Sequence, residues 1–297
     1  MKNKYLRYVD KHISRSYFES KNVFITGGNS GVGFELAKYC AYLGSNVFLL
    51  CRSKEKADKA IKEIKELYPT SNVDFIPLDL ADLNSIKECA NMVKKYDVNM
   101  FVNNAGVFRL PKGETKDGFE ITMGTNFIGV YYLNYLLMPY FKSLNHKVNV
   151  EIMSSIAAKL TKIDFDDFFS LTKYKKFKVY ARSKLALNSI FDKYVEENNE
   201  NINLILTHPG ITYTPLILKA YKNKVFHAIA RGFMKVAFHS ASKAALSALK
   251  GLSLDKTNKI GPRGIFGISG YPGKWIIRKY KKSDKVIEVA NSLLNIK

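Results

Sequence analysis

Short apolar runs and amphipathic stretches alternate along the first two thirds of the chain. The runs are rich in Val, Ile, Phe and Leu, and between them apolar positions recur every three or four residues. These two periods are typical of buried strands and of the helices that cover them. Strands are expected at residues 23–25, 46–50, 73–77, 99–102, 148–153 and 202–207. Helices are expected at residues 32–43, 55–67, 83–94, 120–141 and 174–195.

Strands that alternate with helices predict a parallel sheet covered on both faces. Crossover connections are right-handed, so the predicted fold class is α/β with a doubly wound, Rossmann-type sheet. No internal repeat, low-complexity tract or linker divides the 297 residues, so we expect a single domain over 21–297. Residues 1–20 form an N-terminal extension, whose apolar positions have the spacing of a short amphipathic helix.

The composition, 46% hydrophobic and 25% charged, excludes a disordered, collagenous or coiled-coil chain. No run of 18 apolar residues occurs, and the basic first twenty residues have no continuous apolar core. Neither a transmembrane helix nor a secretory signal is therefore predicted. The three cysteines, Cys40, Cys51 and Cys89, lie in apolar segments without a CxxC pair. This usage argues against disulfides and a metal site, and it favours a cytoplasmic location.

The net charge of +21 is concentrated in the last third of the chain. Residues 201–297 hold 17 basic and 3 acidic side chains, a net +14, and residues 201–254 hold no acidic one. A basic face can meet nucleic acid, an anionic membrane or an anionic cofactor. No nucleic-acid recognition motif accompanies the charge, so no nucleic-acid partner is expected. A solvated lysine-rich surface and a peripheral membrane contact both stay open.

A glycine-rich turn joins the first predicted strand to the first predicted helix. Thr26 is followed by Gly27, Gly28, Asn29, Ser30, Gly31, Val32 and Gly33. Without a Cβ the backbone lets a pyrophosphate approach, and the helix N-terminus offers it free N–H groups. The spacing is Gly-x-x-x-Gly-x-Gly, which differs from the general dinucleotide fingerprint. The turn nevertheless predicts a dinucleotide site, because it opens an α/β chain.

Tyr180 and Lys184 lie four residues apart on a predicted helix, so they share one helix face. A nearby ammonium favours the phenolate and lowers the pKa of a phenol from its usual value near 10. Tyr180 can then exchange a proton with a substrate oxygen, and Ser155, at the end of a strand, can hydrogen-bond the same oxygen. Each of these residues alone has a structural interpretation, so the catalytic hypothesis depends on their combination.

The ordered set of motifs resembles the short-chain dehydrogenase/reductase family over residues 21–272. After the glycine turn the matching motifs are Asp79-Leu80, Asn103-Asn104-Ala105-Gly106, Asn126, Ser154-Ser155, Tyr180 to Lys184 and Pro209 to Thr214. The residues at 117–120, 124–129, 183–186 and 208–210 are similar to those of the retinol dehydrogenase-like and WW-domain oxidoreductase-like branch. Neither the N-terminal anchor of the membrane-bound members nor a WW domain is recognised in these 297 residues, so we expect a departure from those members.

This resemblance implies an oxidoreductase (EC 1.1.1.-) that interconverts an alcohol and a carbonyl by hydride transfer with a nicotinamide cofactor. Tyr180 would be the general acid/base, Lys184 would also hold the nicotinamide ribose, and Asn126 would position a water that relays protons. The implied cofactor contacts are Gly27, Asn29, Ser30, Gly31, Val32, Gly33, Arg52, Asp79, Leu80, Asn104, Ala105, Gly106, Tyr180, Lys184, Pro209, Gly210, Ile211 and Thr214.

The end of the second strand predicts the choice of cofactor. NAD enzymes place an acidic residue there, whereas a basic residue suits the 2′-phosphate of NADP. The sequence has Leu50-Cys51-Arg52-Ser53, without an acid, and Lys54 and Lys56 follow. Arg52 is permanently charged and planar, which favours NADP, as NADPH, over NAD.

Residues 215–238 are apolar but carry five basic side chains. In the family this segment covers the substrate, so the resemblance implies a helical lid over a small lipophilic molecule such as a retinoid, steroid or aldehyde. An ordinary helical pair packed on the domain, with solvated lysines, stays open as an equal alternative. It also leaves a homo-oligomer open. The competing hypothesis is a nucleotide-binding scaffold or sensor at a membrane surface, without turnover. The presence of Ser155, Tyr180 and Lys184 together favours the enzyme.

Overall fold

A computed structural model describes residues 4–197, 199–213, 239–264 and 267–296. The strands of its main sheet are β1 Asn22–Thr26, β2 Asn46–Cys51, β3 Val73–Pro77, β4 Met100–Asn103, β5 Val148–Met153, β6 Ile202–Thr207, β9 Asn258–Pro262 and β10 Pro272–Lys274. Their order is β10-β9-β6-β5-β4-β1-β2-β3. Neighbouring strands are parallel, except that β10 runs antiparallel to β9. A separate pair joins β7 Thr212–Tyr213 to β8 His239–Ser240.

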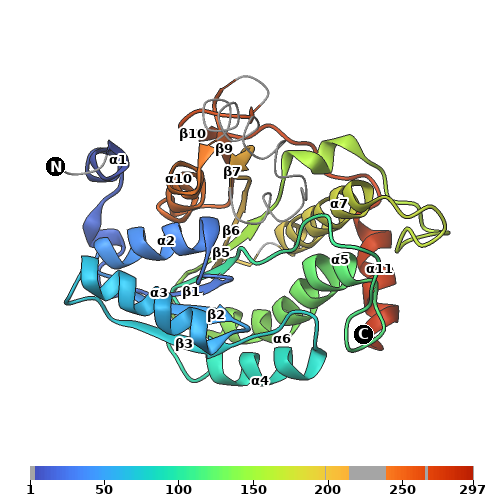
Figure 1. Ribbon diagram of the computed structural model, residues 1–297, viewed down its shortest axis with the longest axis horizontal. Helices are drawn as coiled ribbons and strands as arrows, with labels where there is room; N and C mark the ends of the chain where they lie inside the picture. The colour runs from blue at the N-terminus through green and yellow to red at the C-terminus, as the bar shows by residue number, and fades with distance from the viewer. Residues whose placement is uncertain (1–3, 198, 214–238, 265–266, 297) are drawn as a thin grey trace, which may run out of the picture.

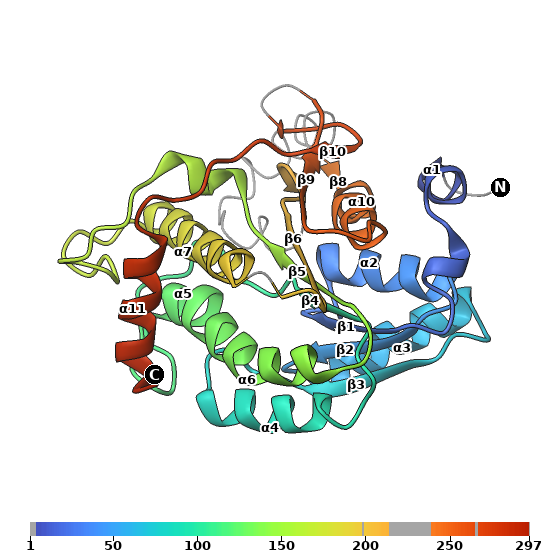
Figure 2. The same ribbon diagram turned by 180° about the vertical axis from the view of Figure 1, so that it is seen from behind.

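Helices cover both faces of this sheet, as Figure 1 and the reverse view in Figure 2 show. One face carries α2 Gly31–Tyr42, α3 Lys54–Leu67 and α10 Ala241–Leu252. The other carries α4 Leu83–Val93, α6 Gly129–Ser143 and α7 Lys176–Glu196. At the periphery, α1 Lys4–His12 packs on α10, and α11 Ser283–Leu294 packs on α7. The remaining helical segments are η1 Arg15–Tyr17, α5 Ile121–Met123, η2 Gly124–Ile128 and η3 Ile156–Leu160.

The prediction of a doubly wound α/β fold is confirmed. β5 and β6 are buried along their whole length, because helices lie on both sides of them. The helix expected at 120–141 consists of α5, a π-helical stretch η2 and α6 in succession. The elements from β9 onward were not predicted.

Polar caps fix where several helices begin. The Ser53 hydroxyl accepts a hydrogen bond from the Lys56 N–H at the start of α3. The Asp82 carboxylate accepts from the N–H groups of Asn84 and Ser85 at the start of α4. Such caps satisfy N–H groups that have no partner within the helix, and each contributes about 1 kcal/mol.

The N-terminal helix α1 is fastened to the domain through buried apolar side chains. Val9 and Ile13 are buried, and the ring of Tyr8 stacks on that of Tyr271 with 4.8 Å between centroids. Cys40, Cys51 and Cys89 are free and buried. Within the described ranges, no helix is both long and apolar enough to cross a bilayer. No cluster of metal-binding side chains occurs there either.

The fold gathers the loops that carry the predicted motifs at one edge of the sheet. The strand order reverses between β1 and β4, and in open α/β sheets ligands bind at such a switch point beyond the carboxyl ends of the strands. Thr214 and the predicted lid at 215–238 lie outside the described residues.

Candidate active site

A cavity of about 590 Å³ lies at the carboxyl ends of the parallel strands, and this volume is in the range of small-molecule sites. Most of the site residues expected from the sequence line it: Gly27, Asn29, Ser30, Gly31, Val32, Arg52, Asp79, Leu80, Asn104, Ala105, Gly106, Ser155, Tyr180, Lys184, Pro209, Gly210 and Ile211. Gly33 and Asn126 are not among its lining residues and support the neighbouring loops instead.

The glycine turn is shaped to bring backbone close to a ligand. Gly27 and Gly31 have φ values of +65° and +59°, which residues with a Cβ rarely adopt. A Cβ on Gly33 would lie 2.4 Å from Asn104 Nδ2. That amide donates to the Thr26 carbonyl (2.8 Å), so it fastens the turn to the loop after β4. The N-terminus of α2 is left facing the cavity, which fits the pyrophosphate of a dinucleotide.

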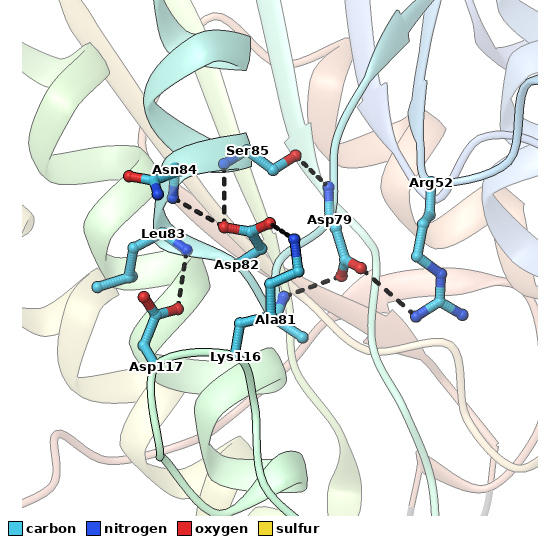
Figure 3. A network of polar contacts seen from close by, with 9 residues as sticks. All are labelled: Arg52, Asp79, Ala81, Asp82, Leu83, Asn84, Ser85, Lys116 and Asp117. Carbon is cyan, nitrogen blue, oxygen red and sulfur yellow. Dashed lines mark hydrogen bonds and ion pairs between the residues drawn. The ribbon is translucent and has the colours of Figure 1, made fainter.

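The end of the cavity that lies beyond β2 and β3 is bounded by a polar network, drawn in Figure 3. Arg52 and Asp79 form an ion pair with 3.7 Å between Nη1 and Oδ2. Asp79 is held further, because its Oδ1 accepts from the Ala81 N–H at 3.0 Å. Arg52 is 78% exposed and has only this long contact in the figure, so its guanidinium can turn toward a phosphate. Lys56 also lines the cavity on this side.

A second part of the same network fixes the start of α4. Asp82 pairs with Lys116, and the hydrogen bond from that ammonium holds the pKa of the Asp82 carboxyl below its usual value. Asp117 accepts from the Leu83 N–H at 2.9 Å (Figure 3). The loop at 115–118 is thereby tied to the helix that follows Asp79.

Tyr180 and Ser155 meet inside the cavity. Tyr180 projects from α7, Ser155 follows β5, and a hydrogen bond between their side chains lowers the pKa of the phenol. Burial is the larger effect and raises that pKa above its usual value. The sequence predicted a pKa lowered by the Lys184 ammonium, whereas in the structure the pKa is raised by burial, and the group that acts to lower it is the Ser155 hydroxyl. The Phe108 ring packs edge-on against Tyr180, with centroids 4.7 Å apart.

Lys184 lies one helical turn further along α7 and reaches the floor of the cavity. It is only 5% exposed, and its Nζ donates to the Met153 carbonyl at 2.8 Å. Burial lowers the pKa of this ammonium to about 8, and the charge of Glu151 acts in the opposite direction. A buried amine of this kind is held close to its titration point at neutral pH.

Asn126 is fully buried within η2. Its Oδ1 accepts from the Val107 N–H (2.7 Å), and its Nδ2 donates to the Val107 carbonyl (2.9 Å) and to Ser183 Oγ (3.0 Å). These contacts join the loop after β4 to α7. Single π-helical turns are frequent at functional sites, where they redirect one side chain.

Sequence reasoning missed the apolar part of the cavity lining. It includes Phe108, Ile156, Leu160 and Phe177. Ile156 directly follows an identified motif, and Phe108 lies two residues after another. Phe177 precedes Tyr180 by about one helical turn, so these positions were the available signal. Leu160 is 71% exposed and Phe177 44% exposed.

Comparison with known proteins settles the family. The family described as short chain dehydrogenase matches residues 21–224. The chain belongs to the short-chain dehydrogenase family. Human retinol dehydrogenase 13 is 35% identical over 208 residues, which cover 68% of this chain and 62% of that protein. Human retinol dehydrogenase 12 is 32% identical over 233 residues, or 77% of this chain and 73% of that protein. The predicted resemblance to the retinol dehydrogenase-like branch is confirmed.

This short-chain dehydrogenase also has solved structural neighbours. An uncharacterised protein of Mycobacterium paratuberculosis superposes with a TM-score of 0.72 at 24% identity, covering 94% of this chain and 95% of its own. The RhlG/NADP active-site complex of Pseudomonas aeruginosa superposes with a TM-score of 0.61 at 22% identity, covering 81% and 92%. At these identities the likeness concerns the fold.

Proposed function

We propose that this short-chain dehydrogenase interconverts an alcohol and a carbonyl on a small lipophilic substrate, using NADP. The observation that carries the proposal is the convergence of Ser155, Tyr180 and Lys184 on the cavity that also receives the glycine turn. An acid–base group, an oxygen-binding hydroxyl and a dinucleotide cradle together suit this reaction class.

The chain's own residues account for positioning and for proton transfer. The bound nicotinamide would supply or accept the hydride. N–H groups of the glycine turn and the start of α2 would bind the pyrophosphate. Ser155 would hold the reacting oxygen by a hydrogen bond, and Tyr180 would give a proton to that oxygen or take one from it. The ammonium of Lys184 would stabilise the phenolate of Tyr180 and hold the nicotinamide ribose. Asn126 would position a water and hold the loop at Val107.

The choice of NADP is supported by the charges at the adenosine end. Arg52 and Lys56 line the cavity there, and no acidic side chain follows β2 directly. Asp79, the carboxylate on this side, is already engaged by Ala81 and by Arg52. A 2′-phosphate would replace Asp79 as the partner of Arg52, in a stronger, charge-assisted contact.

A lipophilic substrate is supported by the apolar lining made by Phe108, Ile156, Leu160 and Phe177. Several relatives are named as retinol dehydrogenases, and a human relative, 35% identical over 64% of this chain, is named polyprenol dehydrogenase. We propose that this chain acts on the same class of substrate, long apolar alcohols. A single domain at 21–297 is part of this proposal, and residues 215–238, which the resemblance assigns to a substrate lid, lie outside the described residues.

We further propose peripheral contact with an anionic membrane, from the cytoplasmic side. Leu160 is 71% exposed and Ile276 is 79% exposed, and the Lys159 ammonium donates to the Ile276 carbonyl at 3.2 Å, which brings the two segments together. Exposed apolar side chains among lysines suit a surface of anionic lipid. Leu160 also lines the cavity, so a substrate in the bilayer would meet the site directly.

Turnover itself tests the proposed function. Purified protein should consume NADPH with long-chain aldehydes, retinal or steroid ketones, followed by absorbance. Tyr180→Phe should lower kcat by about a hundred to ten thousand fold, because general acid–base catalysis is lost. Tyr135→Phe, on α6, is the matched control and should keep wild-type rates. Wild-type turnover by Tyr180→Phe would refute the mechanism. NADPH binding without turnover on any substrate would favour the scaffold or sensor.

A further inference from the structure

His208 is a fully buried histidine that the proposed mechanism does not use. It follows the last residue of β6 and directly precedes Pro209 and Gly210, which line the cavity. The exposed fraction of His208 is 0%, and its backbone N–H donates to the Ile260 carbonyl of β9 at 3.2 Å. Burying a polar ring costs free energy, so the hydrogen bonds that the ring makes indicate its role.

The imidazole holds the turn that follows it. The Gly210 N–H donates to His208 Nδ1 at 3.3 Å. Since an accepting Nδ1 carries no proton, this hydrogen bond assigns a neutral ring with its proton on Nε2. The bond spans two residues, like the turns in which an Asn or Asp side chain accepts from the backbone two residues on. Gly210 has a φ of +74°, which a residue with a Cβ rarely adopts.

The segment between β9 and β10 holds the same turn through a second hydrogen bond. The Ile211 N–H donates to the Ile268 carbonyl at 3.1 Å. A Cβ on Gly210 would lie 2.5 Å from that carbonyl oxygen, so the turn packs closely on this segment. The N–H groups of Gly210 and Ile211 therefore both have partners within the protein, and these partners define the shape of the turn.

Two glycines and a tryptophan shape the space that the imidazole occupies. A Cβ on Gly261 of β9 would lie 2.1 Å from His208 Nε2, and a Cβ on Gly267 would lie 3.1 Å from His208 Cε1. The Trp275 ring packs against the imidazole with 4.4 Å between centroids. The ring has little room to rotate, so its Nδ1 stays directed at Gly210.

We propose that His208 is a positioning residue that holds the Pro209–Gly210 turn in the shape that the bound cofactor requires. The inference rests on the proposed function, in which this turn contacts the nicotinamide cofactor. The turn follows β6, which lies four strands away from β2 in the sheet. Arg52 follows β2 and is proposed to bind the 2′-phosphate. The turn would therefore serve the part of the cofactor that NADPH and NADH share.

The test compares the cofactor affinity of two substitutions of His208. His208→Asn keeps an acceptor for the Gly210 N–H and loses the ring, whereas His208→Leu keeps an apolar side chain and loses the acceptor. His208→Leu should weaken NADPH and NADH alike by about tenfold or more, because the Gly210 N–H loses its partner. His208→Asn should bind both cofactors almost as wild type does, although it unfolds at a lower urea concentration because the space of the ring is unfilled.

This order of affinities separates positioning from a merely structural role. If His208 only filled space, cofactor affinity would follow stability, and His208→Asn would bind no better than His208→Leu. Fluorescence titration with NADPH and NADH gives the affinities, and urea unfolding gives the stability of the same samples. Equal cofactor affinities in the two variants, or weakening in His208→Asn alone, would overturn the proposal.

Gly261→Ala tests the same contact without changing His208. Its new Cβ would displace the imidazole, so both cofactors should weaken as in His208→Leu. Gly273→Ala is the matched control, because Gly273 of β10 pairs in register with Gly261. Its new Cβ would meet the side chain of the exposed residue Arg263, which can turn into solvent. This control should keep wild-type affinities, and equal weakening in the two glycine variants would overturn the proposal.

Cofactor binding and turnover together separate this inference from the proposed function. A wild type that binds NADPH but reduces no carbonyl would refute the proposed function, and the affinities of the two His208 variants would still decide the role of His208. A wild type that binds NADH alone would refute the choice of NADP, and the comparison would then be made with NADH. A wild type that binds neither cofactor would overturn both proposals.

Discussion

At the residue scale, two anions compete for the guanidinium of Arg52: the Asp79 carboxylate and the proposed 2′-phosphate of NADP. Its ion pair with Asp79 is long, at 3.7 Å, and exposed, so it contributes little stability and is easily exchanged. A charge-assisted bond to phosphate is worth about 1.5–3 kcal/mol. Arg52→Ala should therefore weaken NADPH by roughly one to two decades and leave NADH nearly unchanged.

Fluorescence titration of both cofactors measures this difference. Lys54→Ala is the matched control, because Lys54 pairs with Asp58 one turn along α3 and does not line the cavity. Equal weakening of NADPH and NADH by Arg52→Ala would remove Arg52 from the phosphate site.

Residues that belong to ordered motifs were predictable, and isolated ones were not. Motif spacing and the family resemblance predicted that Ser155, Tyr180 and Lys184 act together. In the structure all three line one cavity. Glu151 was missed, since a single acidic residue in an apolar run belongs to no motif. Its conflict with the pattern of a buried strand was the signal, but only the hydrogen bond with Thr207 shows what its carboxyl contacts.

At the scale of elements, α6 approaches the loop after β3 through a glycine. A Cβ on Gly129 would lie 2.2 Å from the Leu80 carbonyl oxygen, and Leu80 lines the cofactor cavity. Gly129→Ala gains up to about 1 kcal/mol of helix propensity. Overpacking against rigid backbone costs about 1–3 kcal/mol, so the net effect should be destabilising.

Gly129→Ala should thus lower the free energy of unfolding in urea and weaken NADPH through the displaced Leu80. Gly113→Ala serves as control, because its new Cβ would meet only the Ile121 side chain, at 3.9 Å. If both variants unfolded at the same urea concentration as wild type, α6 would not be pressed against this loop.

Helices and strands with a clear hydrophobic pattern were predicted close to their observed bounds. Strands that form mainly by pairing with neighbouring strands were not predicted. β5 and β6 match the expected strands at 148–153 and 202–207. β9 contains Asn258, Lys259, Gly261 and Pro262, which do not favour a strand, and it forms by pairing with β6 and β10. The π-helical stretch η2 was also not predicted, because the apolar positions at 120–141 were assigned to one continuous helix.

At the scale of the whole molecule, the net charge of +21 favours contact with anionic surfaces. Each lysine near an anionic bilayer contributes about 1 kcal/mol, and this attraction decays within a Debye length, about 8 Å at physiological salt. The exposed side chains of Leu160 and Phe177 would add an apolar contribution to membrane binding, and salt does not screen this contribution. The two parts can be separated experimentally.

Cosedimentation with vesicles across a salt series makes that separation. Wild type should bind anionic vesicles at low salt, lose most binding at physiological salt and show little on neutral vesicles. Leu160→Asp should remove the binding that survives high salt, because a charge cannot enter the apolar layer. Leu67→Asp is the matched control, since Leu67 is also exposed, at 53%, but lies on α3 away from the cavity. Equal losses in both variants would show that charge alone drives the contact, and no binding to anionic vesicles at low salt would exclude the membrane as a partner.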